Sequence, residues 1–107
     1  MTDLEISKAL ALAIGWNEDD FLLGGWNGPL SICIGADKRG YPIWYDFDFR
    51  EWSVIGPIAE RYNCFPYNII NKGEHTGEWN AIMQGNDSLA DTPQKAIALA
   101  VINGVKK

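Results

Sequence analysis

The sequence predicts an α+β fold, a small three-layer α/β/α sandwich on a mainly antiparallel four-stranded sheet, formed as one domain by residues 1–107. Three segments place apolar residues at helical spacing, and four short segments alternate apolar with polar residues or are rich in aromatic side chains. These segments follow one another in the order α-β-β-α-β-β-α. The 107 residues are 47% hydrophobic, so a core can form without a metal or a disulfide.

The first helix is expected over residues 3 to 14. Thr2 and Glu5 fit a capping box, in which the Thr2 hydroxyl accepts from the Glu5 amide and the carboxylate reaches back. Leu10 belongs to a broad apolar stripe on this segment, and Gly15 suits the left-handed conformation that ends many helices.

Residues 16–29 are glycine-rich and acidic, which predicts a loop with one short turn. Residues 30–34 then alternate with the two-residue period of a half-buried strand. A turn over 36–40 connects this strand to a second one over 41–45, and Pro42 restricts the second strand to an edge of the sheet or to a late start.

The second helix is expected to begin near Ser53 and to run to about residue 63. Its apolar residues recur at helical spacing. Pro57 is tolerated only in the first turn, where backbone amides have no partner within the helix, and this requirement sets the expected start.

A second hairpin is expected from residues 65–70 and 79–83, with the polar residues 71–78 between them as a long, mobile tip. The third helix follows over residues 93–103. Thr92 precedes a proline at the first helical position, and an Asn-Gly pair at 103–104 is expected to end the helix.

The formal net charge of -5 argues against a protein that binds nucleic acid directly, because nonspecific affinity for phosphates depends on clustered Lys and Arg. The first residues are acidic, unlike a secretory signal, and the apolar stretch 10–14 is too short to span a bilayer. We therefore expect a cytoplasmic protein with no membrane partner. In a reducing compartment, Cys33 and Cys64 are expected to be buried small hydrophobes rather than a disulfide or metal ligands.

Several separated segments of the chain resemble small phage and prophage proteins that carry the phage ABA-sandwich domain. The resemblance implies a layered α/β/α fold and a phage or prophage origin, and it brings no activity and no catalytic residues. It is weakest over residues 24–45. The segments that carry it are LALAIGW at 10–16, FDFR at 47–50, VIGPIAERYN at 54–63 with FP at 65–66, WNA at 79–81, DTP at 91–93 and AIALAVI at 96–102.

His75 is the only histidine, and it lies in the expected hairpin tip. A catalytic histidine needs a nucleophile or an orienting carboxylate, and a metal-binding one needs further ligands at workable spacing. Only Glu74 and Glu78 lie near it in the sequence, so we interpret His75 as a solvated loop residue.

Asp46 and Asp48 leave the same side of an extended backbone, with Glu51 close behind them. Such carboxylates can bind a divalent cation or divide acid and base roles. The simpler interpretation, which we favour, is that Asp46 or Asp48 caps the turn into the next helix while Arg50 neutralises the neighbourhood.

Six aromatic residues crowd twelve positions, and strand alternation sends them to both sides of the sheet. Most are therefore expected in the core, with one or two left exposed as anchors for a partner. Trp26 lies in a glycine-rich loop and is a further candidate anchor. The six are Tyr41, Trp44, Tyr45, Phe47, Phe49 and Trp52.

These observations predict a non-enzymatic phage accessory protein that uses no cofactor and no metal. It is expected to bind a host or phage protein with a basic surface, in host takeover or as an anti-defence inhibitor. The alternative is a small cation-binding protein or enzyme that uses Asp46, Asp48 and Glu51. A homodimer through residues 41–45 is a third hypothesis. The expected binding surface comprises Glu18, Asp19, Asp20, Trp26, Tyr41, Trp44, Asp46 and Asp48.

Overall fold

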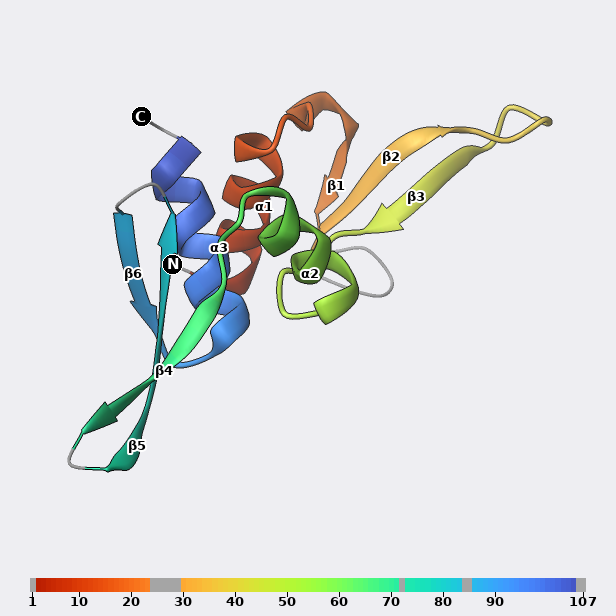
Figure 1. Cartoon of the computed structure of the whole chain (residues 1–107). Coiled ribbons are helices and arrows are strands. Elements are labelled where there is room, and N and C mark those ends of the chain that lie inside the picture. Colours follow the sequence, from red (N-terminus) through yellow and green to blue (C-terminus); the bar gives the residue numbers. More distant parts are fainter. Residues whose placement is uncertain (1, 24–29, 72, 84–85, 106–107) are drawn as a thin grey trace. The chain divides into compact units, whose positions relative to one another are not determined.

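A computed structural model describes residues 2–23, 30–71, 73–83 and 86–105 of the chain (Figure 1). Within these residues it has three α-helices, one short 3₁₀ helix and six strands. The α+β class and the antiparallel pairing are confirmed. The single four-stranded sheet is wrong, because the strands form two separate three-stranded sheets, β1-β2-β3 and β4-β5-β6. The chain accordingly divides into two compact units, Met1–Asp48 and Phe49–Lys107.

The first unit opens with helix α1 (Asp3–Ala13), which begins where the sequence predicts. The capping box is present: the Thr2 hydroxyl oxygen accepts from the Glu5 amide at 3.2 Å, and the Thr2 amide donates to the Glu5 carboxylate at 3.4 Å. Gly15, just beyond the helix, has a φ of +106°, which glycine adopts without steric cost.

The sheet of the first unit is larger than the sequence predicts. The chain forms a 3₁₀ helix η1 (Glu18–Asp20), then strands β1 (Phe21–Leu23), β2 (Leu30–Ala36) and β3 (Pro42–Asp46). The short turn expected after the first helix corresponds to η1, but β1 lies where a loop was expected. Its three residues, Phe-Leu-Leu, are too few to show alternation, and pairing with β2 makes them a strand.

The second unit begins with helix α2 (Trp52–Arg61), close to its expected start. Pro57 lies in the second turn, however, so the requirement that it occupy the first turn is wrong. Proline has no amide to offer the carbonyl of Ser53, four residues earlier. Ser53 is exposed, so water can satisfy that carbonyl.

The second hairpin consists of β4 (Pro66–Asn71) and β5 (Glu74–Met83), and β6 (Asn86–Ala90) completes the sheet. The long tip predicted for residues 71–78 is wrong, because β5 begins at Glu74, which pairs with Asn71. The sequence did not indicate β6, which contains only two apolar residues and relies on pairing with β5.

A bulge in β5 explains how polar residues continue the strand. The Thr76 hydroxyl donates to the carbonyl of Ile69 at 3.1 Å and accepts from the amide of Glu78 at 3.3 Å. Gly77 between them has a φ of +82°. The extra residues are thus held by side-chain hydrogen bonds in place of regular ladder bonds.

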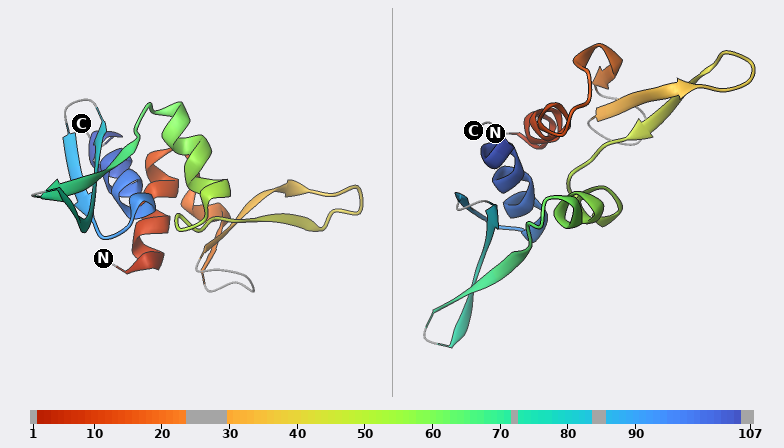
Figure 2. Two further views of the ribbon diagram at one scale, coloured as in Figure 1. Left: turned by 60° about the horizontal axis from the view of Figure 1, so that its bottom comes forward. Right: turned by 45° about the horizontal axis from the view of Figure 1, so that its top comes forward.

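Helix α3 (Pro93–Val105) packs on one face of the β4–β5–β6 sheet (Figure 2). It continues past its expected end at residue 103 because Gly104 permits close packing: a Cβ there would lie 2.8 Å from the sulfur of Met83. The Asn103 amide also donates to the hydroxyl of Ser88 on β6 at 3.4 Å. In the described ranges, no helix is long and apolar enough to cross a bilayer.

Candidate functional site

Strands β2 and β3 extend beyond β1 as a two-stranded ribbon (Figure 1). Strand β1 pairs with Leu30–Ile32 of β2, so among the residues that the structure describes the remainder of β2 pairs on one side alone, with β3. We call residues 33–44 the β2–β3 ribbon. Its turn is fixed by Asp37, whose carboxylate accepts from the amides of Arg39 at 2.9 Å and Tyr41 at 3.0 Å.

The ribbon also contains a β-bulge in β2. Cys33 pairs with Trp44 and Gly35 pairs with Ile43, which leaves Ile34 as the extra residue. Bulges increase the local twist of a strand and redirect its side chains. Ile34 is exposed as a result of this arrangement.

Apolar and aromatic side chains are exposed along the ribbon. Tyr41 is 64% exposed and Trp44 is 45% exposed, and both belong to the binding surface expected from the sequence. Because Trp44 and Ile43 are neighbours on a strand, they project to opposite faces of the ribbon. Exposed apolar residues of the first sheet and its ribbon are Leu22, Leu23, Ile34, Tyr41, Ile43 and Trp44.

The other crowded aromatics divide between core and surface. Phe47 and Phe49 are fully buried, whereas Trp52 on α2 is exposed. Tyr45 is half-buried, its ring meets Phe47 edge-to-face at 6.1 Å between centroids, and burial raises the pKa of its hydroxyl. Trp26, the other expected anchor, lies outside the described residues.

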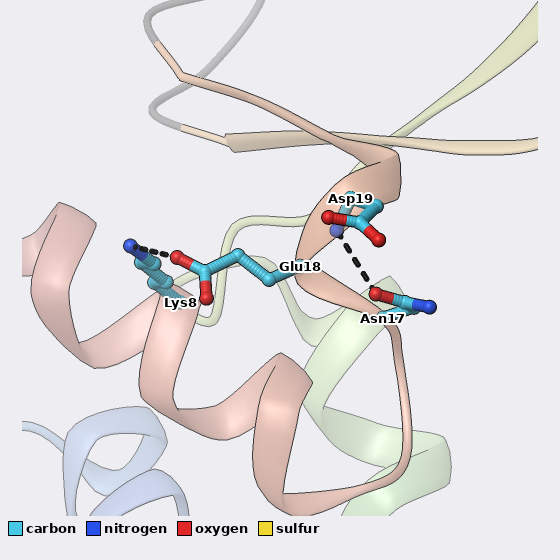
Figure 3. Close-up of polar contacts among 4 residues, drawn as sticks. All are labelled: Lys8, Asn17, Glu18 and Asp19. Atoms are coloured by element: carbon cyan, nitrogen blue, oxygen red, sulfur yellow. Dashed lines mark hydrogen bonds and ion pairs between the residues drawn. The ribbon is translucent and has the colours of Figure 1, made fainter.

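The acidic residues of η1 are exposed and lie next to the sheet in the first unit (Figure 3). A carboxylate oxygen of Glu18 lies 2.7 Å from the ammonium of Lys8, so one charge is compensated within the unit. The Asn17 side chain caps the short helix by accepting from the Asp19 amide at 3.0 Å. This cap fixes a turn that presents Asp19 and Asp20 to solvent.

The carboxylates of the alternative cation site have different surroundings. Asp46 is exposed on β3 and accepts from the Ser31 hydroxyl at 3.3 Å, whereas Asp48 is buried. Glu51 is the N-cap of α2, without a side-chain capping bond, so neither Asp46 nor Asp48 occupies the N-cap position; that one of them caps the turn into this helix stays a prediction. In the part of the chain that the structure describes, no three His, Cys, Asp or Glu side chains form a group that could hold a metal ion.

Both cysteines are free thiols. Cys64 is fully buried and burial raises the pKa of its thiol, which confirms its expected place in the core. Cys33 is half-buried on the ribbon, where its thiol donates to the carbonyl of Gly35 at 3.4 Å. His75 is part of β5, where it pairs with Ile70, and not part of a loop.

The two units differ strongly in formal charge. Residues 1–48 contain eight of the 14 carboxylates and three of the nine Lys and Arg residues, so the entire net charge of -5 belongs to the first unit. The second unit has six residues of each sign and is neutral. The sequence contains this asymmetry, but the boundary at residue 48 becomes evident only in the structure.

Sequence reasoning missed a second group of exposed apolar residues, on the β4–β5–β6 sheet. Tyr67, Ile82 and Leu89 are exposed on three different strands. The sequence contained a signal for Tyr67 and Ile82, because both lie in predicted strands whose side chains alternate between the two faces of a sheet. Leu89 was missed because β6 was not predicted.

Comparisons of the chain with protein-family models, with curated proteins and with solved structures found no match. The resemblance to the phage ABA-sandwich family therefore stays a prediction that depends on the sequence segments given above.

Proposed function

We propose that this chain is a non-enzymatic binding module whose first unit docks on a basic surface of another protein. The observation that carries the proposal is the exposure of Tyr41 and Trp44 on the β2–β3 ribbon. Large aromatic side chains supply much of the binding energy at protein interfaces, because they bury a large area with few rotatable bonds.

The edge of the ribbon offers backbone groups as well as side chains. Among the described strands β3 pairs only with β2, so within this part of the chain its other edge has no strand partner for its amides and carbonyls. The Phe47 amide donates to the Leu30 carbonyl at 2.9 Å, and alternation along an antiparallel pair therefore directs the backbone groups of Trp44 and Asp46 away from β2. An extended segment of a partner can pair with this edge.

The charge of the first unit selects the partner. Asp19, Asp20 and Asp46 are exposed in the unit that carries the whole net charge of -5. A surface of this kind attracts basic partners and repels acidic ones, and the attraction weakens as salt screens it. A protein surface rich in Lys and Arg, such as a nucleic-acid groove, fits these properties.

The setting that we propose follows from the sequence resemblance. The chain acts as a phage or prophage accessory protein in the cytoplasm of a bacterial host. There it occupies the basic surface of a host or phage protein, in host takeover or as an anti-defence inhibitor. We favour this function over cation binding by Asp46, Asp48 and Glu51, because the first is exposed and the second is buried.

The electrostatic part of the proposal is tested by changing charge without changing shape. We expect the triple variant Asp19→Asn, Asp20→Asn, Asp46→Asn to capture less partner from host lysate at low salt than the wild-type chain. A matched triple variant of the neutral unit, Glu51→Gln, Glu60→Gln, Asp91→Asn, also removes three exposed carboxylates and should capture as much as the wild type. Equal capture by the first triple variant and the wild-type chain would contradict the proposed electrostatic attraction.

A further inference from the structure

The sheet of the second unit has one face that no described element of this unit covers. Cross-strand partners share a face, so Pro66, Ala81 and Ser88 lie on one side of the sheet. Ala81 and Ser88 are buried, and the Ser88 hydroxyl accepts from Asn103 of α3, which identifies this side as the helix-covered face. The opposite side is the open face, defined by Tyr67, Asn80, Ile82, Asp87 and Leu89.

Apolar side chains are exposed on all three strands of the open face. Tyr67 is 47% exposed, Ile82 is 42% exposed and Leu89 is 59% exposed. Tyr67 and Leu89 flank the same central residue, Asn80, so the apolar groups are neighbours across the sheet. Contiguous apolar groups of this kind mark interaction surfaces more often than scattered single residues do.

A buried amide in the middle of the open face lacks a hydrogen bond. Asn80 is only 5% exposed, its Nδ2 donates to the hydroxyl of Tyr67, and its Oδ1 has no partner among the described residues. Turning the amide over exchanges the two ends and still leaves one of them unpaired. Because pairing a buried polar group is favourable, a partner that donates a hydrogen bond to this amide would bind the face more tightly.

The charge of the sheet identifies the chemistry of that partner. Strands β4, β5 and β6 contain three carboxylates, at Glu74, Glu78 and Asp87, and no Lys or Arg. Asp87 pairs with Ile82 and so lies at the border of the open face, where it is exposed. A second copy of this chain would bring like charges together there, whereas a cationic segment would be attracted.

The width of the face indicates the form of the partner. Three strands span about 10 Å between the outer two, which matches the diameter of one α-helix. Helix α3 already packs on the other side of the same sheet. A second helix on the open face would place the sheet between two helical layers.

We propose that the open face binds one amphipathic helix of a partner protein, with an apolar stripe bordered by Lys and Arg. The stripe covers Tyr67, Ile82 and Leu89, and a donor beside it pairs with Asn80 Oδ1. This surface belongs to the neutral second unit and does not depend on the β2–β3 ribbon. The chain would thus contact two partner surfaces.

The test uses a synthetic helical peptide of about 18 residues with a Leu stripe bordered by Lys, labelled with a fluorophore. Its fluorescence anisotropy is followed as the full chain is added, at low and high salt. We expect saturable binding that weakens with salt. A matched peptide with Glu in place of Lys should bind at least about tenfold more weakly, and equal binding of the two peptides would overturn the proposal.

Variants locate the site. Leu89→Lys removes an exposed apolar group and adds repulsion, and we expect it to weaken binding of the Lys peptide about tenfold or more. Ile82→Thr, which keeps a β-branched strand residue, should weaken it less, while Trp52→Ala on α2 should leave it unchanged. Circular dichroism checks that each variant is folded.

Three results would contradict the proposal. One is wild-type affinity in both Leu89→Lys and Ile82→Thr, which would place the peptide elsewhere. Another is loss of binding in Trp52→Ala, which would assign the peptide to α2. The third is a dimer of the chain that Leu89→Lys dissociates, since the occupant would then be a second copy.

Discussion

Two helical glycines have opposite surroundings in the second unit. A Cβ added at Gly104 would lie 2.8 Å from the Met83 sulfur, whereas one added at Gly56 in α2 would meet nothing within 4 Å. We expect Gly56→Ala to stabilise the chain by about 0.5 to 1 kcal/mol through helix propensity. Gly104→Ala should destabilise it by about 1 kcal/mol, because overpacking exceeds that gain. Urea unfolding measures both, and stabilisation by Gly104→Ala would contradict the close packing of α3 on β5.

The buried thiol of Cys64 makes stability depend on pH in one direction. Burial raises its pKa in the folded chain, so its contribution is complete below the ordinary thiol pKa and is lost as the pH rises through the raised value. Tyr45, whose pKa is raised by the same cause, adds a loss at higher pH. We expect the free energy of unfolding to fall as the pH rises above about 9, the ordinary pKa of the thiol, and to fall less in Cys64→Ala. An equal fall in both chains would contradict the burial of Cys64.

Helix α2 contains a proline that its packing does not require. Pro57 is exposed and removes one amide from the interior of the helix. We expect Pro57→Ala to stabilise the chain by about 2 kcal/mol, because the amide of Ala can pair with the Ser53 carbonyl. Thermal and urea unfolding test this, with Pro66→Ala at the start of β4 as the comparison. An unchanged midpoint would mean that α2 is strained or bent in a way that alanine does not relieve.

The elements that the sequence predicted correctly are those with local chemical signals. The Thr2–Glu5 capping box placed α1, and Pro93 after Thr92 placed the start of α3. Strands β1 and β6 were missed because three or five residues with little alternation become strands only through their partners. The tip of the second hairpin was missed because the Thr76 hydrogen bonds that hold its bulge require a known register.

The candidate site could be predicted in part, because some of its residues also have a local signal in the sequence. The sequence drew attention to Tyr41 and Trp44 by their crowding with other aromatics, and the structure shows both to be exposed. The sequence could not distinguish these two exposed residues from the buried Phe47 and Phe49, because burial depends on where the pairing of β1 with β2 ends. The sequence could not show that Asp48 is buried and Asp46 exposed, because β3 ends at Asp46 and strand alternation does not continue to Asp48.

At the scale of the whole molecule, charge and exposed apolar surface are distributed differently between the two units. The first unit carries the net charge of -5 and the aromatic ribbon, and the second is neutral with an apolar open sheet face. We therefore expect added salt to weaken binding through the first unit more than it weakens binding through a neutral interface. Capture from host lysate at low and high salt, with the tagged wild-type chain, measures this dependence. Partners retained fully at high salt would contradict it.

The most direct test of the account compares partner capture by three tagged chains in host lysate: wild type, the double variant Tyr41→Ala, Trp44→Ala, and Trp52→Ala. Trp52 is the matched control, because it is an exposed tryptophan of the other unit. The account predicts that the double variant, still folded by circular dichroism, loses a stoichiometric partner about tenfold, while Trp52→Ala retains it. The same yield from the double variant and the wild type, or a partner lost only in Trp52→Ala, would contradict the assignment of binding to the ribbon.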